Sequence, residues 1–120
     1  MTEQINVSIG ELFDKFSILE IKKCKIKNEQ KLSFVTKEIN FLNPLIQKYN
    51  CPFYDELRCI NEELWNIEDE IRQKEVEKMF DDEFVQLARR VYLTNDKRAK
   101  CKERINVYFN SDIREVKEYK

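Results

Sequence analysis

The chain has 120 residues, with 22 basic and 23 acidic side chains, no histidine and one glycine, Gly10. This length fits a single domain, and the missing histidine excludes Ser-His-Asp and Cys-His catalytic groups. One glycine also excludes a Gly-rich phosphate loop or a dinucleotide-binding fingerprint, so acid–base chemistry by Asp, Glu, Lys or Tyr and electrostatic capture by Arg and Lys stay open.

The first predicted helix follows a short extended segment. Apolar and polar residues alternate over residues 4–8, which predicts a short strand or an extended lead-in. Ser8 and Glu11 have the capping-box spacing, so a helix is expected to begin there and to run to about Asn28.

Two longer helices are predicted next. Apolar residues recur every three or four positions over about 30–49, and Pro44 inside this pattern predicts a kink or a new turn. The helix breaks before Pro52, a residue suited to the first turn of a helix. The third helix is expected over about 53–79.

The fourth helix is expected to be capped by Asp81 or Asp82 and to end at Asn110-Ser111, with an extended or frayed tail. An apolar stripe runs along this helix and is interrupted in its middle by three polar residues, Asn95, Arg98 and Lys102. The apolar residues before the interruption are Phe84, Leu87, Ala88 and Val91, and those after it are Ile105, Tyr108 and Phe109. Charges on a burying stripe are costly unless they are paired. We therefore expect these residues either to be neutralised by another helix or to line a site.

Together these patterns predict an all-α domain over residues 1–120. The expected architecture is a four-helix antiparallel bundle, or long helical hairpins with short extended termini. Acidic residues predominate over 55–83 and basic residues over 89–104, so the third and fourth helices are expected to form a charge-complementary hairpin about 80–82. Extra apolar residues such as Trp65 predict self-association.

Composition also bears on location, metals and partners. No signal-like or membrane-spanning run is present, so we expect a soluble cytoplasmic protein. The scattered cysteines are expected to be reduced and partly buried: Cys24, Cys51, Cys59 and Cys101. A zinc site built from cysteines alone is the alternative. A net charge of −1 without an aromatic-rich basic face argues against nucleic acid.

Polar side chains beside the apolar rows form a candidate ligand-binding set. Its members are Lys15 and Lys22 on the first helix, Glu68 and Arg72 on the third, and Arg89, Tyr92, Asn95, Asp96, Arg98 and Lys102 on the fourth. In a bundle they would meet in one layer, which predicts a polar pocket between helices. The predicted occupant is an anionic small ligand, such as a nucleotide or sugar phosphate, and no cofactor or metal is predicted.

The predicted roles follow from side-chain chemistry. The anion-binding groups are the arginines at positions 72, 89 and 98, because a guanidinium makes bidentate contacts. Tyr92 is expected to stack or donate a hydrogen bond, and Asn95 to hydrogen-bond. Glu68 and Asp96 are expected to orient the arginines.

Two other interpretations stay open. The polar cluster could be a structural network that only fixes helix register, with Arg98 paired to Glu63 or Asp96, in a structural or protein-interaction domain. A small helical enzyme acting on a phosphorylated substrate is the third interpretation, with Glu68 or Asp96 as base. Helical nucleotide pyrophosphohydrolases bind magnesium through carboxylates three residues apart on helices. Here Glu11/Asp14 has the Glu-x-x-Asp form and Glu115/Glu118 has the Glu-x-x-Glu form, but the second pair lies in the tail, so the motif is incomplete.

Three blocks resemble a bacterial and phage domain family of unknown function. They are GELFDKFSILEIK at 10–22, LWNIEDEIR at 64–72 and FVQLARRVYLTNDKRA at 84–99. The family pattern closes with Gly-Ser and Glu-x-Lys-x-Tyr, whereas this chain has Asn110 in place of that glycine. The resemblance implies that the charged groups of the second and third blocks act as one unit. It also implies that such domains occur alone or beside glycosyltransferases and repeat-containing proteins, and it implies no activity.

Overall fold

The computed structural model describes residues 1–118, which fold into four α-helices. The helices are α1 (Ile9–Lys25), α2 (Glu29–Ile46), α3 (Tyr54–Glu77) and α4 (Asp82–Tyr108). No strand forms among the described residues, so residues 4–8 are the extended lead-in rather than the strand. The all-α prediction is confirmed.

Side-chain caps begin three of the helices. The backbone N–H groups in the first turn of a helix have no partner within the helix, so a side-chain oxygen that accepts from one stabilises the end. Ser8 caps α1, Asn28 caps α2 and Asp81 caps α4, with hydrogen bonds of 3.0, 2.9 and 2.9 Å. Because Asn28 caps the second helix, α1 ends at Lys25, before the position predicted for it.

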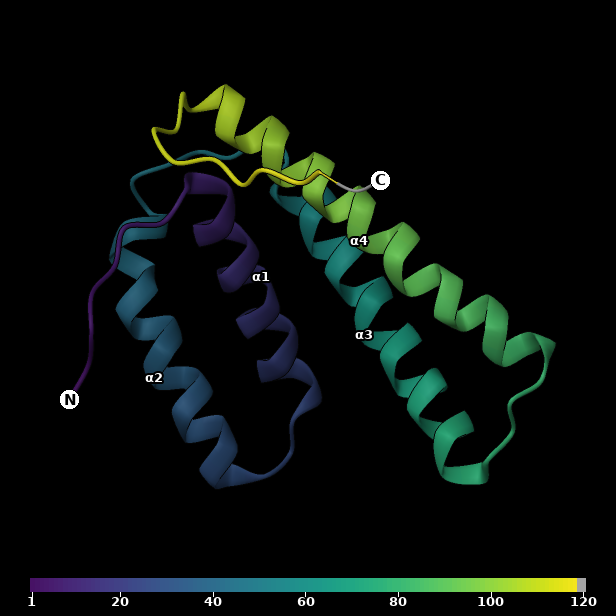
Figure 1. Cartoon of the computed structure of the whole chain (residues 1–120). Coiled ribbons are helices and arrows are strands. Elements are labelled where there is room, and N and C mark those ends of the chain that lie inside the picture. Colours follow the sequence, from purple (N-terminus) through teal and green to yellow (C-terminus); the bar gives the residue numbers. More distant parts are fainter. Residues whose placement is uncertain (119–120) are drawn as a thin grey trace.

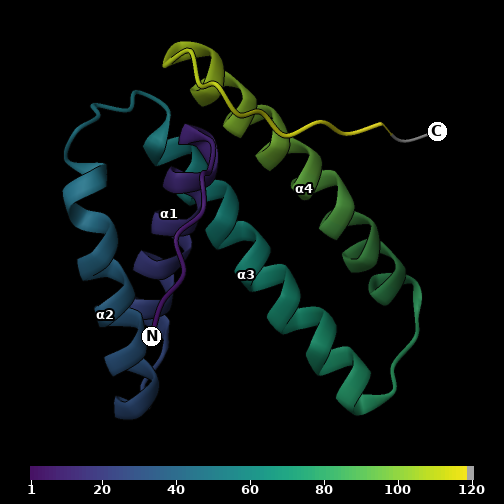
Figure 2. The ribbon, with the colours of Figure 1, turned by 60° about the vertical axis from the view of Figure 1, so that its left-hand side comes forward.

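The helices form two hairpins that lie close together at one end and diverge toward their turns (Figures 1 and 2). In the described part of the chain, α1 packs against each of the other three helices, and α3 packs along α4. The predicted hairpin of α3 and α4 is therefore confirmed, with its turn between Glu77 and Asp82. The radius of gyration is 16.2 Å, whereas a compact domain of this length has about 14 Å. The molecule is an open V.

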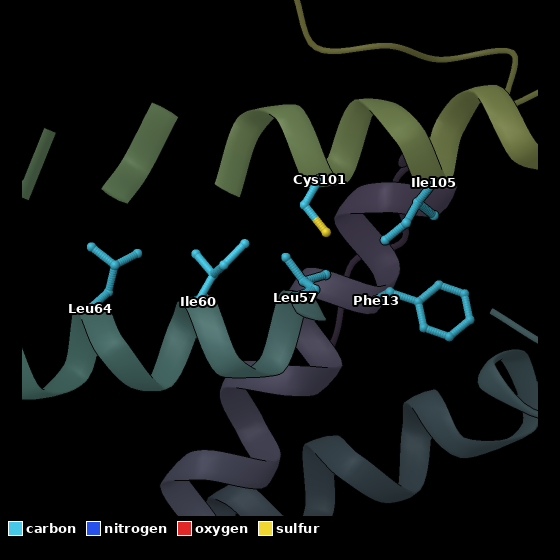
Figure 3. Packing of buried hydrophobic residues seen from close by; sticks show 6 residues of the cluster. All are labelled: Phe13, Leu57, Ile60, Leu64, Cys101 and Ile105. Atoms are coloured by element: carbon cyan, nitrogen blue, oxygen red, sulfur yellow. The ribbon is translucent and has the colours of Figure 1, made fainter. Parts of the chain in front are cut away.

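The main core lies where α1 meets the hairpin of α3 and α4. In Figure 3, Leu57, Ile60 and Leu64 of α3 point toward Cys101 and Ile105 of α4. Phe13 of α1 joins this cluster, and its ring contacts the rings of neighbouring aromatic residues, which are Tyr49, Tyr54 and Phe109. A smaller cluster between α1 and α2 contains Leu19, Val35 and Ile39. The core therefore fixes how α1 is placed against the second hairpin.

The buried face of α4 differs from the predicted stripe. Its most buried residues between the two ends are Leu87, Thr94 and Cys101, one position before the predicted row. Asn95 and Arg98 consequently lie at the edge of the buried face, where a charge can reach solvent. Lys102, in contrast, is buried as predicted.

No helix in residues 1–118 combines the length and the apolar character that a membrane span requires.

Candidate functional site

A groove of about 440 Å³ lies between α1 and the hairpin of α3 and α4. Its apolar surface comes from α1 and α3, and its polar groups come from α3 and α4. The residues that line it are Ile18 and Ile21 of α1; Asn61, Leu64, Trp65, Glu68, Asp69 and Arg72 of α3; and Asn95 and Arg98 of α4. A partly apolar concavity with a few converging polar groups is the usual form of a small-ligand site.

The structure brings together four of the predicted site residues, and these are Glu68, Arg72, Asn95 and Arg98. The expectation that the whole set would meet in one layer is wrong. Arg89, Tyr92 and Asp96 are exposed, because the buried face of α4 turns the opposite side of the helix to solvent.

The lysines of the candidate set also lie outside the groove. Lys15 forms an ion pair of 2.8 Å with Glu38 of α2. Lys22 is partly exposed near the end of α1, and Lys102 belongs to a separate cluster described below.

A buried polar network holds Arg98 in the wall of the groove. Arg98 Nη1 donates to Asn61 Oδ1 at 3.2 Å. The amide nitrogen of Asn61 donates to Asp14 Oδ1 at 2.8 Å and to Ser17 Oγ at 2.7 Å. Asp14, Ser17 and Asn61 are all at most 5% exposed. Since each buried group has a partner, the network orients the guanidinium without leaving a polar atom unsatisfied.

The charge of Arg98 is not neutralised by a carboxylate. Among residues 1–118 Arg98 forms no salt bridge, and its contact with Asn61 is to a neutral amide oxygen. Glu63 instead lies 3.6 Å from Arg90, and Asp96 faces solvent. The pairing of Arg98 with either acid, which the register-fixing interpretation offered, is therefore absent from the described residues, and the guanidinium keeps donors for a further anionic partner.

The rim of the groove carries charges of both signs. Arg72 Nε lies 3.3 Å from Glu68 Oε2, one helical turn away on α3, and Asp69 is exposed beside this pair. Glu68 is therefore within ion-pair distance of Arg72, and its role in orienting that arginine for a ligand stays a prediction. Trp65 is half-buried and contributes an indole ring to the same side. Its flat apolar face is suited to stacking with a planar ligand.

A second polar cluster surrounds Lys102. The ammonium lies 2.7 Å from Glu11 Oε2, 3.1 Å from Glu115 Oε2 and 3.6 Å from Asp14 Oδ2. Burial by itself lowers the pKa of Lys102, but the hydrogen bond that its ammonium donates to Glu11 and the charge of Asp14 outweigh this effect and raise the pKa overall. Lys102 therefore stays charged, and its hydrogen bond holds the pKa of Glu115 below the usual range.

The Lys102 cluster includes three of the acids considered for a magnesium site. Glu11, Asp14 and Glu115 lie 2.7 to 3.6 Å from the Lys102 ammonium, but among the described residues no three carboxylates are placed to hold a metal ion. A fixed positive charge there opposes a divalent cation. In this chain the three carboxylates neutralise a lysine and join the tail to α1 and α4.

Gly10 lets the start of α1 approach α4 closely. Its N–H donates to Asn106 Oδ1 at 2.6 Å, and a Cβ atom would lie 2.7 Å from the carbonyl oxygen of Lys102. Ile9 N–H donates to Ser111 Oγ at 3.2 Å. These contacts fix α1 against α4, and they thereby align Asp14 with both polar clusters.

The predicted ligand-binding set does not include the residues that organise the site, which are Asp14, Ser17, Asn61 and Asn106. A signal existed for Asn61, which follows directly on the apolar row of α3. The single glycine was also a signal, since glycine within a helix often marks a close backbone approach.

The cysteines are free thiols, with Cys24 and Cys59 exposed and Cys101 buried. Burial raises the pKa of Cys101 to about 11, so this thiol is protonated at neutral pH. In the part of the chain that the structure describes, no group of three or more Cys, Asp or Glu side chains could hold a metal ion. That the cysteines bind no metal in solution stays a prediction.

Comparison with family models matches residues 3–120 to a family of unknown function, DUF6165. The chain belongs to this family. Searches of curated proteins and of solved structures found no match. The match extends over nearly the whole chain and includes the residues of both polar clusters.

The structure explains one difference between this chain and the family pattern that it resembles. Asn110 stands where that pattern has glycine, and it has a φ of 51° in the left-handed region. Asparagine tolerates this region better than most residues, so the turn after α4 is kept. Ser111 then reaches the N-terminus of α1. Tyr119, which closes the pattern, lies outside the described residues.

Proposed function

We propose that this protein is a non-catalytic binding module whose groove takes a small anionic ligand with a planar or apolar part, such as a nucleotide or a sugar phosphate. The observation that carries the proposal is Arg98. It is oriented by a buried amide, it lies in the wall of the groove, and it has no carboxylate partner among residues 1–118. Holding a guanidinium in place without neutralising it prepares it for an anion.

The remaining groups of the groove suit the other parts of such a ligand. Trp65 and Leu64 offer apolar surface to a base or a sugar face, while Asn95 and Asp69 can hydrogen-bond to hydroxyl groups. The volume of about 440 Å³ is in the range of small-molecule sites.

The register-fixing interpretation is supported by a different part of the site. The hydrogen bonds among Asp14, Ser17 and Asn61 are complete without any ligand, as a structural network requires. The two interpretations differ at Arg98, because only a ligand site needs its charge. Replacing this residue therefore separates them.

The test compares wild type, Arg98→Met and a matched control, Arg90→Met. Each protein is heated with and without nucleotides, nucleotide sugars and sugar phosphates. A ligand at 100 times its dissociation constant stabilises wild type by about 2.7 kcal/mol. In Arg98→Met the unliganded stability should fall by only about 1 kcal/mol, since one hydrogen bond to an amide is lost, while the ligand response disappears.

Arg90→Met removes an arginine from the same helix but outside the groove, so its ligand response should equal that of wild type. A retained response in Arg98→Met would contradict the proposal, as would a wild-type protein that none of these compounds stabilises. A loss of stability of several kcal/mol in Arg98→Met would support the register-fixing interpretation instead.

A further inference from the structure

The outer side of α2 carries an apolar row without a partner in the described chain. Phe34, Phe41 and Leu45 are 67%, 60% and 40% exposed. Together with Glu38 they follow a spacing of four, three and four residues, which is the spacing of helices that pack side by side. The neighbouring side of α2 is already used, because Val35 and Ile39 pack on α1.

Basic residues flank this row. Lys31 and Lys37 lie one helical turn from Phe34 on either side, so the three side chains share one surface of the helix. Glu38 does not offset these charges, because it pairs with Lys15. We call the surface formed by Phe34, Phe41, Leu45, Lys31 and Lys37 the α2 face. It is both apolar and basic.

The turn between α3 and α4 has the complementary character. Four apolar residues are exposed there, at 45 to 76%: Val76, Met79, Phe80 and Val85. Five acids accompany them: Glu75, Glu77, Asp81, Asp82 and Glu83. Lys74 pairs with Asp81 and Glu83, so the acids of this turn that form no salt bridge in the described chain are Glu75, Glu77 and Asp82. We call residues 75–85 the acidic tip, because this segment contains five acidic residues and a single basic residue, Lys78.

The α2 face and the acidic tip cannot meet within one chain. They belong to different hairpins, and the hairpins diverge toward their turns, so the tip lies at the far end of the second arm (Figures 1 and 2). The extents of 46 × 41 × 26 Å reflect this open form. Each surface is therefore available to another molecule.

We propose that the partner is a second copy of this chain, with the acidic tip of each copy docked on the α2 face of the other. One chain carries both halves of the contact, so a two-fold axis satisfies both tips and both faces and closes the assembly. Opposite charges around apolar centres favour this register and disfavour like surfaces meeting. An anionic membrane or nucleic acid would be repelled by the tip. The contact uses neither Arg98 nor the groove, so it does not depend on the proposed ligand.

The experiment uses two full-length charge-reversal variants. Lys31→Glu/Lys37→Glu makes the α2 face acidic, and Glu75→Lys/Glu77→Lys makes the tip basic. Both are compatible with folding, since Lys31 is in the first turn of α2 and the acids are in the last turn of α3, where the new charges suit the helix dipoles. Sedimentation velocity with circular dichroism follows mass and folding. Lys97→Glu/Lys100→Glu on the exposed side of α4 is the control.

Wild type and the control should sediment as particles of twice the chain mass of 14.7 kDa. Each charge-reversal variant alone should dimerise more weakly by about tenfold or more, or about 1.4 kcal/mol. An equimolar mixture of the two should form dimers again, because every tip then meets a face of opposite charge. A monomeric wild type, larger or open-ended assemblies, or a mixture that stays monomeric while both variants are folded would overturn the proposal.

Discussion

At the scale of single residues, the polar groups that matter most are those that the fold surrounds rather than those that face solvent. Asp14 is the clearest case, because its two carboxylate oxygens serve different clusters. Oδ1 accepts from Asn61 in the network behind the groove, and Oδ2 lies 3.6 Å from Lys102. One buried carboxylate thus ties α1 to both α3 and α4.

Gly10 gives the sharpest prediction at this scale. A methyl group in Gly10→Ala would meet the Lys102 carbonyl at 2.7 Å, and the amide of Asn106 at 2.9 Å, so the helices must move apart. We expect a loss of about 1–3 kcal/mol in the free energy of unfolding, which is typical of overpacking. Chemical denaturation measures it. Ser33→Ala, an exposed change on α2, is the control and should change stability by well under about 1 kcal/mol. An unchanged Gly10→Ala would refute the close approach.

At the scale of elements, caps and apolar spacing were sufficient to predict four helices with ends within a few residues. The side-chain caps by Ser8 and Asp81 were predicted from short local patterns, and the structure contains both. The prediction of the buried face was less accurate for α4. Its buried side is set by where α1 crosses it, and that crossing depends on contacts such as Gly10 with Asn106 that lie far apart in sequence.

The dependence on contacts that are distant in sequence also explains which residues of the candidate site could be predicted. Glu68, Arg72, Asn95 and Arg98 belong to one hairpin, so opposed charge and helical spacing could place them together. Asp14, Ser17 and Lys102 depend on how α1 meets that hairpin. Helical periodicity identifies one face of a helix, but it does not contain the distance or angle to a helix from another hairpin.

The C-terminal tail gives a prediction about pH. The hydrogen bond from Lys102 lowers the pKa of Glu115 below its ordinary value of 4.5, and Glu11, Asp14 and Lys117 are the other charged groups near this contact. A depressed carboxyl pKa stabilises the fold above pH 4.5, and this contribution is lost as the pH falls through the folded-state value. Because Glu115 is partly exposed, the contribution should be under about 1 kcal/mol.

Thermal unfolding of wild type and Glu115→Gln measures this contribution. Wild type should be the more stable protein at pH 6, and the difference should shrink as the pH falls below 4.5. Glu3→Gln, in the exposed N-terminal segment, should show no such difference. If the difference in stability between wild type and Glu115→Gln persists unchanged at low pH, the ion pair does not hold the tail.

At the scale of the whole molecule, the open V explains why a chain of this size has both a groove and unpartnered apolar surfaces. The core is concentrated where α1 meets the second hairpin, which leaves the arms largely solvated. The groove lies beside this core, so its walls are held by well-packed helices. The arms are available for the pairing of two copies proposed above, and the two proposed functions use separate parts of the molecule.

The central claim is that the groove binds an anionic ligand through Arg98, and Trp65 allows a direct measurement. It is the single tryptophan of the chain and it lines the groove, so its fluorescence reports on the groove. Titration with a nucleoside diphosphate sugar should change the Trp65 emission saturably in wild type and in Arg90→Met, and should leave Arg98→Met unchanged. Emission that stays constant in wild type for every phosphorylated compound, or that changes equally in folded Arg98→Met, would contradict the claim.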